Sequence, residues 1–441
     1  MSTTKLDTDY LIVGAGAMSL AFADEILRGD RGARMVIVDR REAPGGHWND
    51  AYSFVRLHQP SAFYGLNSIP LGPGGTDRAS GPEVVAYYAR AMDRFLATGR
   101  VRFLPMSEYR GEGRVVSVLD ENQVTEVTAR RRVVDGTYMA VEVPSRRPPA
   151  YAVDPGVCVV PPNGLPHITR PWRRYVVVGA GKTGLDALLF LLDQGVSPDR
   201  IRWVVSQDAW LLSRDSMSPK VVLDTFTSML ENIVGASDVD EVFLRLEREG
   251  IVFRVDPSTL PPKWRCATVD HRELAAFRRI NDVVRMGRVK RISPGQIHLE
   301  GGVLDTDEDS LFIDCTANGL ARIEPRPLFA EGRVTLQSVV MCQQTFGAAL
   351  IGRIELMDVD DRKRNELCAP TPHPERKEEL LTAVTGSTDN LLRLAPHLPV
   401  WLRRSRLNLA GHAPLHRYLL DVGKLALRRR AAVASMNRIL G

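Results

Sequence analysis

Long apolar runs are absent from this chain of 441 residues, which nowhere carries the roughly 18 consecutive apolar residues of a membrane-spanning helix. Hydrophobic residues make up 44% and charged residues 25%, so the composition argues against the disordered and membrane classes. The first apolar run, at residues 10–13, leads straight into a glycine-rich turn. We therefore expect no signal peptide and a cytoplasmic location. The length suits two or three domains.

Cysteine is scarce, and its spacing matches none of the common metal or redox motifs. The number is odd and no pair has C-x-x-C spacing; the five are Cys158, Cys266, Cys315, Cys342 and Cys368. This pattern fits a reducing compartment and argues against a metal cluster or a redox-active dithiol. We expect no metal site, and Cys315, inside an apolar strand, is predicted to be an inert core residue.

Acidic residues are nearly missing from the last 41 positions. Eight Arg and one Lys face one acid there, which gives this segment a net charge of +8 within a chain of +5. A basic tail is typical of binding to an acidic partner or an anionic surface, and the alternative is a solvated helical face. Both alternatives stay open. We expect no nucleic-acid partner.

A glycine-rich turn follows the first apolar run, in the sequence YLIVGAGAMS. A helical pattern and a second apolar strand, ARMVIVD, come next and end on Asp39. Gly14 permits the tight turn, Gly16 lets backbone approach a pyrophosphate at the helix N-terminus, and Asp39 can accept hydrogen bonds from a ribose. Ser19 stands in place of the third glycine and is small enough for close helix–strand packing. The pattern predicts a dinucleotide site.

A second, complete glycine turn lies between the strand RRYVVV and the helix LDALLFLLDQG, with Gly179, Gly181 and Gly184. Lys182 and Thr183 lie within it. Two turns of this kind predict two nucleotides.

The strand after the second turn, RIRWVV, ends at Ser206 and Gln207 without an acid. Because an acid there would repel a ribose 2′-phosphate, its absence favours NADPH over NADH. Arg214 and Lys220 follow and are candidate partners of that phosphate. The alternative is that both are ordinary surface cations.

The segment after Asp39 contains Gly45, Gly46, His47 and Trp48, a permissive turn beside an aromatic ring. Such a turn suits a flat ring system that stays bound, whereas an exchanging NADPH needs a more open groove. We therefore assign FAD to the first turn and NADPH to the second.

With these features, the sequence resembles the flavoproteins with two dinucleotide-binding domains, most closely the flavin-containing monooxygenases and their Baeyer–Villiger and N-hydroxylating relatives. The stretches that carry the resemblance are GAGAMS with VDRREAPGGHW, VRLHQPSAFYGLNSIPLG, VVVGAGKTGLDALLFL with WVVSQDAWLLSR, and DEDSLFIDCTANG. The resemblance implies an α/β fold of two Rossmann-like domains, with the FAD domain split around an inserted NADPH domain. The C-terminal tail matches nothing in that family and is predicted to be mainly helical.

Three departures from the family pattern keep other activities open. The fingerprint F-x-G-x-x-x-H between the turns is not intact in PNGLPHITRPW. His58-Gln59 stands where the family carries Asn-Thr beside the flavin, which puts oxygen chemistry in question. Gln207 stands where the NADPH strand usually carries Arg.

Four segments are predicted. Residues 1–171 form the first part of the FAD domain, with a β-meander at 113–143 and a crossover that holds eight prolines. Residues 172–285 form the NADPH domain with a helical insertion, residues 286–355 return to the FAD domain, and residues 356–441 form the helical tail.

The candidate catalytic residues are His58, Gln59 and Ser61, as polar lining near the flavin, with His58 as a proton donor. The alternative is that they are loop residues bonded to backbone. The candidate cofactor contacts are Gly14, Gly16, Ser19, Asp39, Arg40, Gly46, His47, Trp48, Arg56, Gly179, Gly181, Lys182, Thr183, Gly184, Ser206, Arg214, Asp314 and Thr316.

The favoured function is an FAD- and NADPH-dependent monooxygenase that uses molecular oxygen on a heteroatom or carbonyl of a small molecule. One alternative is a flavin dehydrogenase, oxidase or reductase without oxygen insertion. Another is a flavoprotein whose FAD is structural and which acts as a binding module. Homo-oligomerisation stays open.

Overall fold

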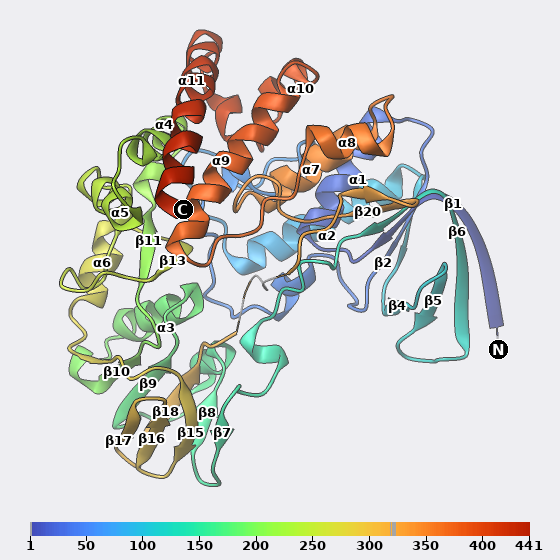
Figure 1. Ribbon diagram of the computed structural model, residues 1–441. Helices are drawn as coiled ribbons and strands as arrows, with labels where there is room; N and C mark the ends of the chain where they lie inside the picture. Colours follow the sequence, from blue (N-terminus) through green and yellow to red (C-terminus); the bar gives the residue numbers. More distant parts are fainter. Residues whose placement is uncertain (1, 318, 320–322) are drawn as a thin grey trace.

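The computed structural model describes residues 2–317, 319 and 323–441. Two sheets dominated by parallel strands lie apart along the molecule, each with helices packed on it, and a helical C-terminal region extends beside them (Figure 1). The predicted α/β class with two Rossmann-like units is confirmed.

The first sheet has the order β19-β20-β6-β1-β2-β3, with β4 and β5 attached through β6. Its strands are β1 (Ser2–Val13), β2 (Met35–Val38), β3 (Val101–Leu104), β4 (Ser107–Tyr109), β5 (Arg114–Ser117), β6 (Gln123–Asp135), β19 (Phe329–Ala330) and β20 (Arg333–Thr335). The strands β4, β5 and β6 form an antiparallel run, of which β5 and β6 fall within the predicted meander at 113–143 and β4 precedes it. Because β19 and β20 come from beyond residue 322, this domain is split by the second one, as predicted.

Helices cover one face of the first sheet, and the meander covers the other. The helices are α1 (Ala17–Gly29), α2 (Gly81–Ala97), α7 (Gln344–Glu355) and α8 (Asp361–Leu367). The largest apolar cluster joins α1, α2 and α7 to the sheet, and α1 packs directly on α7. On the opposite face, Leu11 and Val36 pack with Val115 and Val127 of the meander. Burial of both faces explains the continuous apolar runs of β1 and β2.

The second sheet is fully parallel, in the order β14-β10-β9-β18-β8. Its strands are β8 (Cys158–Val160), β9 (Arg174–Val178), β10 (Ile201–Val204), β14 (Asp282–Val284) and β18 (Ser310–Asp314), with α3 (Lys182–Asp193) and α6 (His271–Phe277) packed against it. A small sheet adjoins it, with β7 (Ala152–Val153), β15 (Val289–Ser293), β16 (Gln296–Leu299) and β17 (Gly302–Asp305).

This topology corrects the predicted domain boundaries. The predicted return to the FAD domain at residue 286 is wrong, because β15 to β18 all belong to the second domain. Strand β18 lies between β8 and β9, with Phe312 paired to Val176. The second domain therefore begins within the proline-rich crossover, and its strands end with β18. The five buried residues of β18 suit the interior of any parallel sheet, which is why the sequence did not decide between the two.

The insertion after β10 contains a three-stranded sheet as well as the predicted helices. Its elements are β11 (Ala209–Ser213), β12 (Val252–Phe253), β13 (Lys263–Val269), α4 (Val222–Ile233) and α5 (Val239–Arg248). The C-terminal helices are α9 (Lys377–Leu394), α10 (Pro399–Arg404) and α11 (Leu415–Leu440). Helices α9 and α11 share an apolar cluster with α4 and α5.

Part of the positive charge on the basic tail forms ion pairs with acidic side chains of the same chain. Arg417 pairs with Asp224 of α4 at 2.5 Å, and Arg428 pairs with Glu231 at 2.9 Å. Arg429 pairs with Asp389 of α9. In the part of the chain that the structure describes, no helix has both the length and the apolar character needed to cross a bilayer.

Candidate nucleotide sites and the residues between them

The first glycine turn has the geometry that its sequence predicts. Gly14 has a φ of +91°, a conformation that favours glycine, and it ends β1. Gly16 caps the start of α1, and no side chain hydrogen-bonds the first amides of that helix. Such amides need an acceptor, and a phosphate supplies one. The Ser19 hydroxyl is buried and finds no hydrogen-bond partner among the residues that the structure describes, and a Cβ on Gly136 would lie 1.8 Å from it. Ser19 thus packs closely, as expected of the third motif position.

Asp39 stands at the end of β2, beside this turn. Its carboxylate accepts from the backbone N–H of Ala15 at 2.6 Å and of Arg41 at 2.8 Å, and its side chain is buried. Each carboxylate oxygen has room for a further donor, so a ribose hydroxyl fits the group.

The Gly45–Trp48 turn packs against protein rather than lying open for a ring. The Gly45 N–H donates to the Ala15 carbonyl at 2.8 Å, and a Cβ on Gly46 would lie 3.0 Å from the Cα of Gly16. Gly46 therefore allows two backbones to approach closely. The Trp48 ring nitrogen donates to the Tyr64 hydroxyl at 2.7 Å.

His47 stacks on Trp48, with ring centroids 5.5 Å apart. Burial, with a smaller contribution from the Arg41 charge, lowers the pKa of His47 to about 4. Its imidazole is therefore neutral near pH 7.

The second glycine turn fits a nucleotide at each of its three glycines. Gly179 has a φ of +124°, and a Cβ there would lie 2.7 Å from the Cys315 carbonyl oxygen. A Cβ on Gly184 would lie 2.2 Å from the Gly179 carbonyl oxygen, so only glycine lets α3 pack this closely on the turn. Within residues 2–317, 319 and 323–441, no atom lies within 4 Å of a Cβ on Gly181, which begins α3 without a side-chain cap. An uncapped helix start beneath open space fits a pyrophosphate.

A loop of the first domain packs on the start of α3. The Tyr52 hydroxyl donates to Asp186 at 2.6 Å, and Lys182 pairs with the same carboxylate. Phe54 stacks on Phe190, with centroids 4.4 Å apart. These contacts fix the loop that leads to His58 against the second glycine turn, so side chains of one domain reach the site of the other.

His58 is held between this loop and β13. Its carbonyl accepts from the Thr268 hydroxyl at 2.5 Å, and its Nδ1 lies 3.4 Å from the Cys266 carbonyl oxygen. Burial, and then the charge of Lys182, lower the pKa of His58 to about 4. The tautomer with a proton on Nδ1 donates to Cys266 and leaves Nε2 as an acceptor. The sequence predicted a proton donor, but a neutral ring at pH 7 is better suited to accept a proton or relay one.

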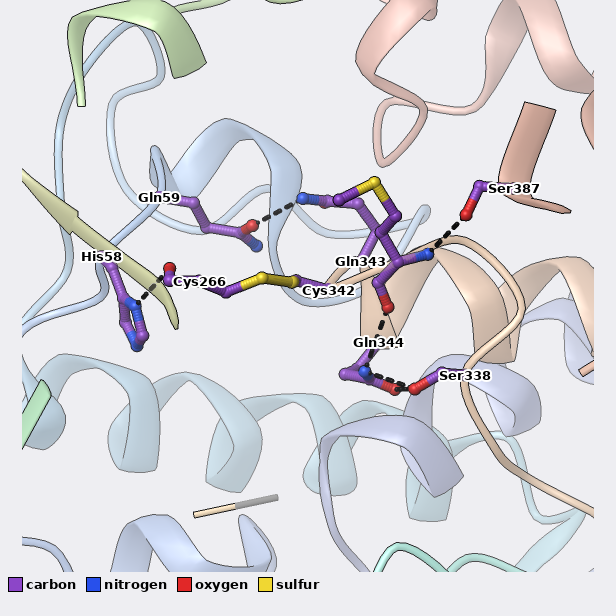
Figure 2. The surroundings of a disulfide bond; sticks show 9 residues. His58, Gln59, Cys266, Ser338, Cys342, Gln343, Gln344 and Ser387 are labelled. Atoms are coloured by element: carbon purple, nitrogen blue, oxygen red, sulfur yellow. Dashed lines mark hydrogen bonds between the residues drawn. A yellow bond between two sulfur atoms is a disulfide. The ribbon is translucent and has the colours of Figure 1, made fainter. Parts of the chain in front are cut away.

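Gln59 contacts Gln343 at the start of α7. The sequence indicates Gln59 but no residue of α7. The Gln343 amide donates to Gln59 Oε1 at 2.8 Å (Figure 2). Gln343 Oε1 and the Thr345 hydroxyl are buried and have no hydrogen-bond partner in the described part of the chain, and the N-cap residue of α7 makes no side-chain cap bond there. Together with Ser19 at the first turn, these orphaned groups fit a polar ligand such as FAD that extends from α1 to α7.

The catalytic role predicted for Ser61 is corrected, because its hydroxyl already forms hydrogen bonds within its own loop. It accepts from the Ala79 N–H at 2.7 Å and donates to Asp77 at 3.2 Å, and the residue is fully buried. Ser61 holds its own loop in place, which was the alternative reading of the sequence. We remove it from the candidate catalytic residues.

The predicted location of Asp314 and Thr316 is also corrected. Asp314 ends β18 and Thr316 follows it at the carboxyl edge of the second sheet, and Asp314 accepts from the Thr316 hydroxyl at 2.7 Å. They therefore lie beside the second glycine turn rather than the FAD domain. Cys315 between them is buried, which raises its pKa well above the usual value and confirms an inert core thiol.

Arg214 is engaged by protein groups. Its guanidinium bonds Asp270 at 2.5 Å, Glu273 at 2.5 Å and the Thr268 carbonyl at 3.0 Å. A role toward a 2′-phosphate would have to compete with these partners and stays a prediction. Ser206 is exposed after β10, where such a phosphate has access.

Two further predicted contacts lie on the surface. Arg40 pairs with Glu108 at 3.8 Å, and Arg56 donates to the Arg78 carbonyl at 3.1 Å. Neither is drawn into the cluster around His58.

The cysteine prediction is wrong for two residues. Cys266 of β13 and Cys342, just before α7, form a disulfide across 76 residues of sequence. Figure 2 shows this disulfide beside His58 and Gln59. Short spacing rules did not find it, because each cysteine comes from a different part of the fold.

No protein-family model matches the chain. An uncharacterized protein of Mycobacterium tuberculosis is 45% identical over 423 residues, which are 92% of this chain and 78% of that protein. An uncharacterized protein of Mycobacterium bovis matches to the same extent. The chain belongs to their family.

Solved structures similar to this one are flavin enzymes. ε-Caprolactone-bound cyclohexanone monooxygenase has a TM-score of 0.54 at 13% identity and covers 82% of this chain and 89% of its own. OTEMO in complex with FAD and NADP has a TM-score of 0.52 at 15% identity, covering 82% and 84%. A flavin monooxygenase from Stenotrophomonas maltophilia has a TM-score of 0.50 at 16% identity, covering 82% and 100%. The chain thus has the fold of the flavin-containing and Baeyer–Villiger monooxygenases, which confirms the resemblance at the level of the fold.

Proposed function

We propose that the protein is an FAD- and NADPH-dependent monooxygenase that oxygenates a heteroatom or a carbonyl group of a small molecule with molecular oxygen. The observation that carries this proposal is the pair of glycine turns. Each starts a helix without a side-chain cap, and a loop of the first domain reaches from one site to the other. The names of structures with this fold, one of them in complex with FAD and NADP, support the choice of nucleotides.

The first site would hold FAD through the amides of α1, Ser19 and Asp39, and through Gln343 and Thr345 at the start of α7. The second would hold NADPH through the amides of α3, over Gly181. When bound, the flavin supplies two-electron redox chemistry and reaction with oxygen. The chain supplies the position of each nucleotide and the polar groups between them.

His58 is the residue best placed to handle a proton between the two sites. Its ring is neutral near pH 7, it is held by Cys266 and Thr268, and Lys182 of the second turn is near enough to lower its pKa. Nε2 therefore serves as a proton acceptor. Burial, and then the charge of Lys182, keep the ring unprotonated near pH 7, so that Nε2 can accept a proton.

A second candidate is a flavin oxidoreductase without oxygen insertion. Two observations favour it: His58-Gln59 stands where the resembled family carries Asn-Thr, and the Gln59 side-chain oxygen already accepts from the Gln343 amide. The two candidates differ in whether oxygen appears in the product.

The experiment is oxidation of NADPH by the FAD-loaded protein with cyclic ketones, thioethers and amines under labelled dioxygen. A monooxygenase places the label in an organic product, in proportion to the NADPH consumed. Release of all the reducing equivalents as peroxide, or electron transfer to an acceptor without label, would favour the second candidate. Failure to bind FAD would contradict both. The Ser61→Ala variant is the matched control, because Ser61 lies outside the proposed site.

A further inference from the structure

Three segments that are far apart in sequence bring potential metal ligands together beside the His58 loop. Cys266 lies on β13, Cys342 lies just before α7, and His373 lies in the loop between α8 and α9. One ligand atom from each lies within 4.8 Å of the others. All three residues are half-buried, so an ion from solvent has a route to them.

One ring nitrogen of His373 makes no hydrogen bond to the described residues. Its Nδ1 atom is buried and has no hydrogen-bond partner among the described residues. A buried polar nitrogen without a partner is costly, so it calls for an occupant of the space beside it. Pro372 and Pro374 flank the histidine and restrict its backbone.

The backbone spacing of the two cysteines suits a bridging ion. Their Cα atoms are 6.9 Å apart, just beyond the roughly 4.4–6.8 Å usual for disulfides. Two thiolates on one tetrahedral zinc, with Zn–S bonds of about 2.3 Å, lie roughly 3.8 Å from each other. Strand β13 and helix α7 can therefore stay in place when the disulfide opens.

We propose that the reduced Cys266–Cys342 pair and His373 form a zinc site, with the fourth coordination position open to water. Opening the disulfide consumes two electrons and two protons from a dithiol reductant, which becomes a disulfide itself. Zn²⁺ then replaces the two thiol protons, and His373 binds as neutral imidazole. Two thiolates and one imidazole are ligands that zinc prefers over magnesium or calcium.

The surrounding charge is compatible with this assignment. Two thiolates cancel the two charges of zinc, so the filled site adds no net charge to a half-buried position. The nearby cations are already paired: Lys263 contacts Glu375 at 2.8 Å, and Arg265 contacts the same carboxylate at 3.5 Å. The site does not depend on bound nucleotides, so it can hold zinc whether or not the proposed oxygenase activity is correct.

The test compares zinc content and thiol number in the full-length protein after anaerobic reduction and incubation with zinc chloride. We expect about one zinc per chain, falling at least about tenfold in Cys266→Ser, Cys342→Ser and His373→Gln. Cys158→Ser is the matched control, because Cys158 is also half-buried and free but lies on β8. Circular dichroism verifies that each variant is folded.

A second readout on the unaltered protein covers the case in which a cysteine variant does not fold. Cobalt(II) in place of zinc should give thiolate-to-cobalt charge-transfer absorption, and oxidation to the disulfide should abolish it. Reduced protein with five titratable thiols and no zinc would overturn the proposal. So would a disulfide that resists dithiothreitol in the folded protein, or zinc binding that His373→Gln leaves unchanged.

Discussion

Replacing Gly184 by alanine should destabilise the second domain, although the position is helical. Alanine favours a helix interior by about 1 kcal/mol over glycine. Here its Cβ would lie 2.2 Å from the carbonyl oxygen and 3.0 Å from the carbonyl carbon of Gly179. Because these are backbone atoms of a tight turn, α3 must move away, at the upper end of the roughly 1–3 kcal/mol cost of overpacking. We expect a net loss of about 1–2 kcal/mol in the free energy of unfolding.

Gly181→Ala, at the same turn, should weaken NADPH binding with only a small loss of stability. No atom of the described residues lies within 4 Å of a Cβ at this position, so only the weaker helix cap costs stability, by about 0.5–1 kcal/mol. The same Cβ would occupy the space that a pyrophosphate needs. We expect the dissociation constant for NADPH to rise at least about tenfold, or 1.4 kcal/mol.

Gly423→Ala in α11 is the matched control for both variants. No atom lies within 4 Å of a Cβ there either, but the position is inside an exposed helix. It should gain about 0.5–1 kcal/mol. Urea unfolding gives the stabilities, and calorimetric titration gives the NADPH affinities. Gly184→Ala with unchanged stability, or Gly181→Ala with unchanged NADPH affinity, would refute the reasoning about the turn.

Three more predictions follow from side chains near the site. Folding lowers the pKa of His58 from 6.5 to about 4, so between these pH values the unfolded state binds a proton that the folded state does not. The free energy of unfolding therefore falls as pH drops from about 6.5 to 4. Unfolding curves of His58→Gln at pH 4 and 7 should show up to about 3 kcal/mol less of this loss. Ser61→Ala leaves the Ala79 N–H without its acceptor and should cost about 1–2 kcal/mol in urea unfolding, with FAD affinity unchanged. Arg214→Gln removes the guanidinium that pairs with Asp270 and Glu273, of which Glu273 keeps Arg78 at 3.8 Å, and should cost about 2 kcal/mol or more in urea unfolding. Weaker NADPH binding with unchanged stability would instead support the predicted phosphate contact.

The glycine turns could be predicted from sequence because their determinants are local. The turn glycine, the glycine at the helix start and the residue that touches the turn lie within six positions, and the structure gives Gly14, Ser19 and Gly184 the expected geometry. Each requirement is a backbone angle or a close approach that few residues satisfy.

Assignments that depend on distant partners failed. The strand of Phe312 is apolar enough for either sheet, and only its pairing with Val176 places it in the second domain. The disulfide joins Cys266 to Cys342 from separate domains, so no spacing rule applies. From the sequence, Ser61 is a polar residue near the expected flavin site. In the structure its hydroxyl hydrogen-bonds its own loop, which the sequence alone does not indicate.

The measurement that tests the central claim most directly is anaerobic mixing of the FAD-loaded protein with NADPH, followed by visible absorption. If the two glycine turns bring the two nucleotides together, NADPH bleaches the flavin band in the unaltered protein, and in Gly181→Ala bleaching requires at least about ten times more NADPH. A flavin that binds but is not bleached by NADPH or NADH would contradict the account and leave the second turn without its proposed ligand.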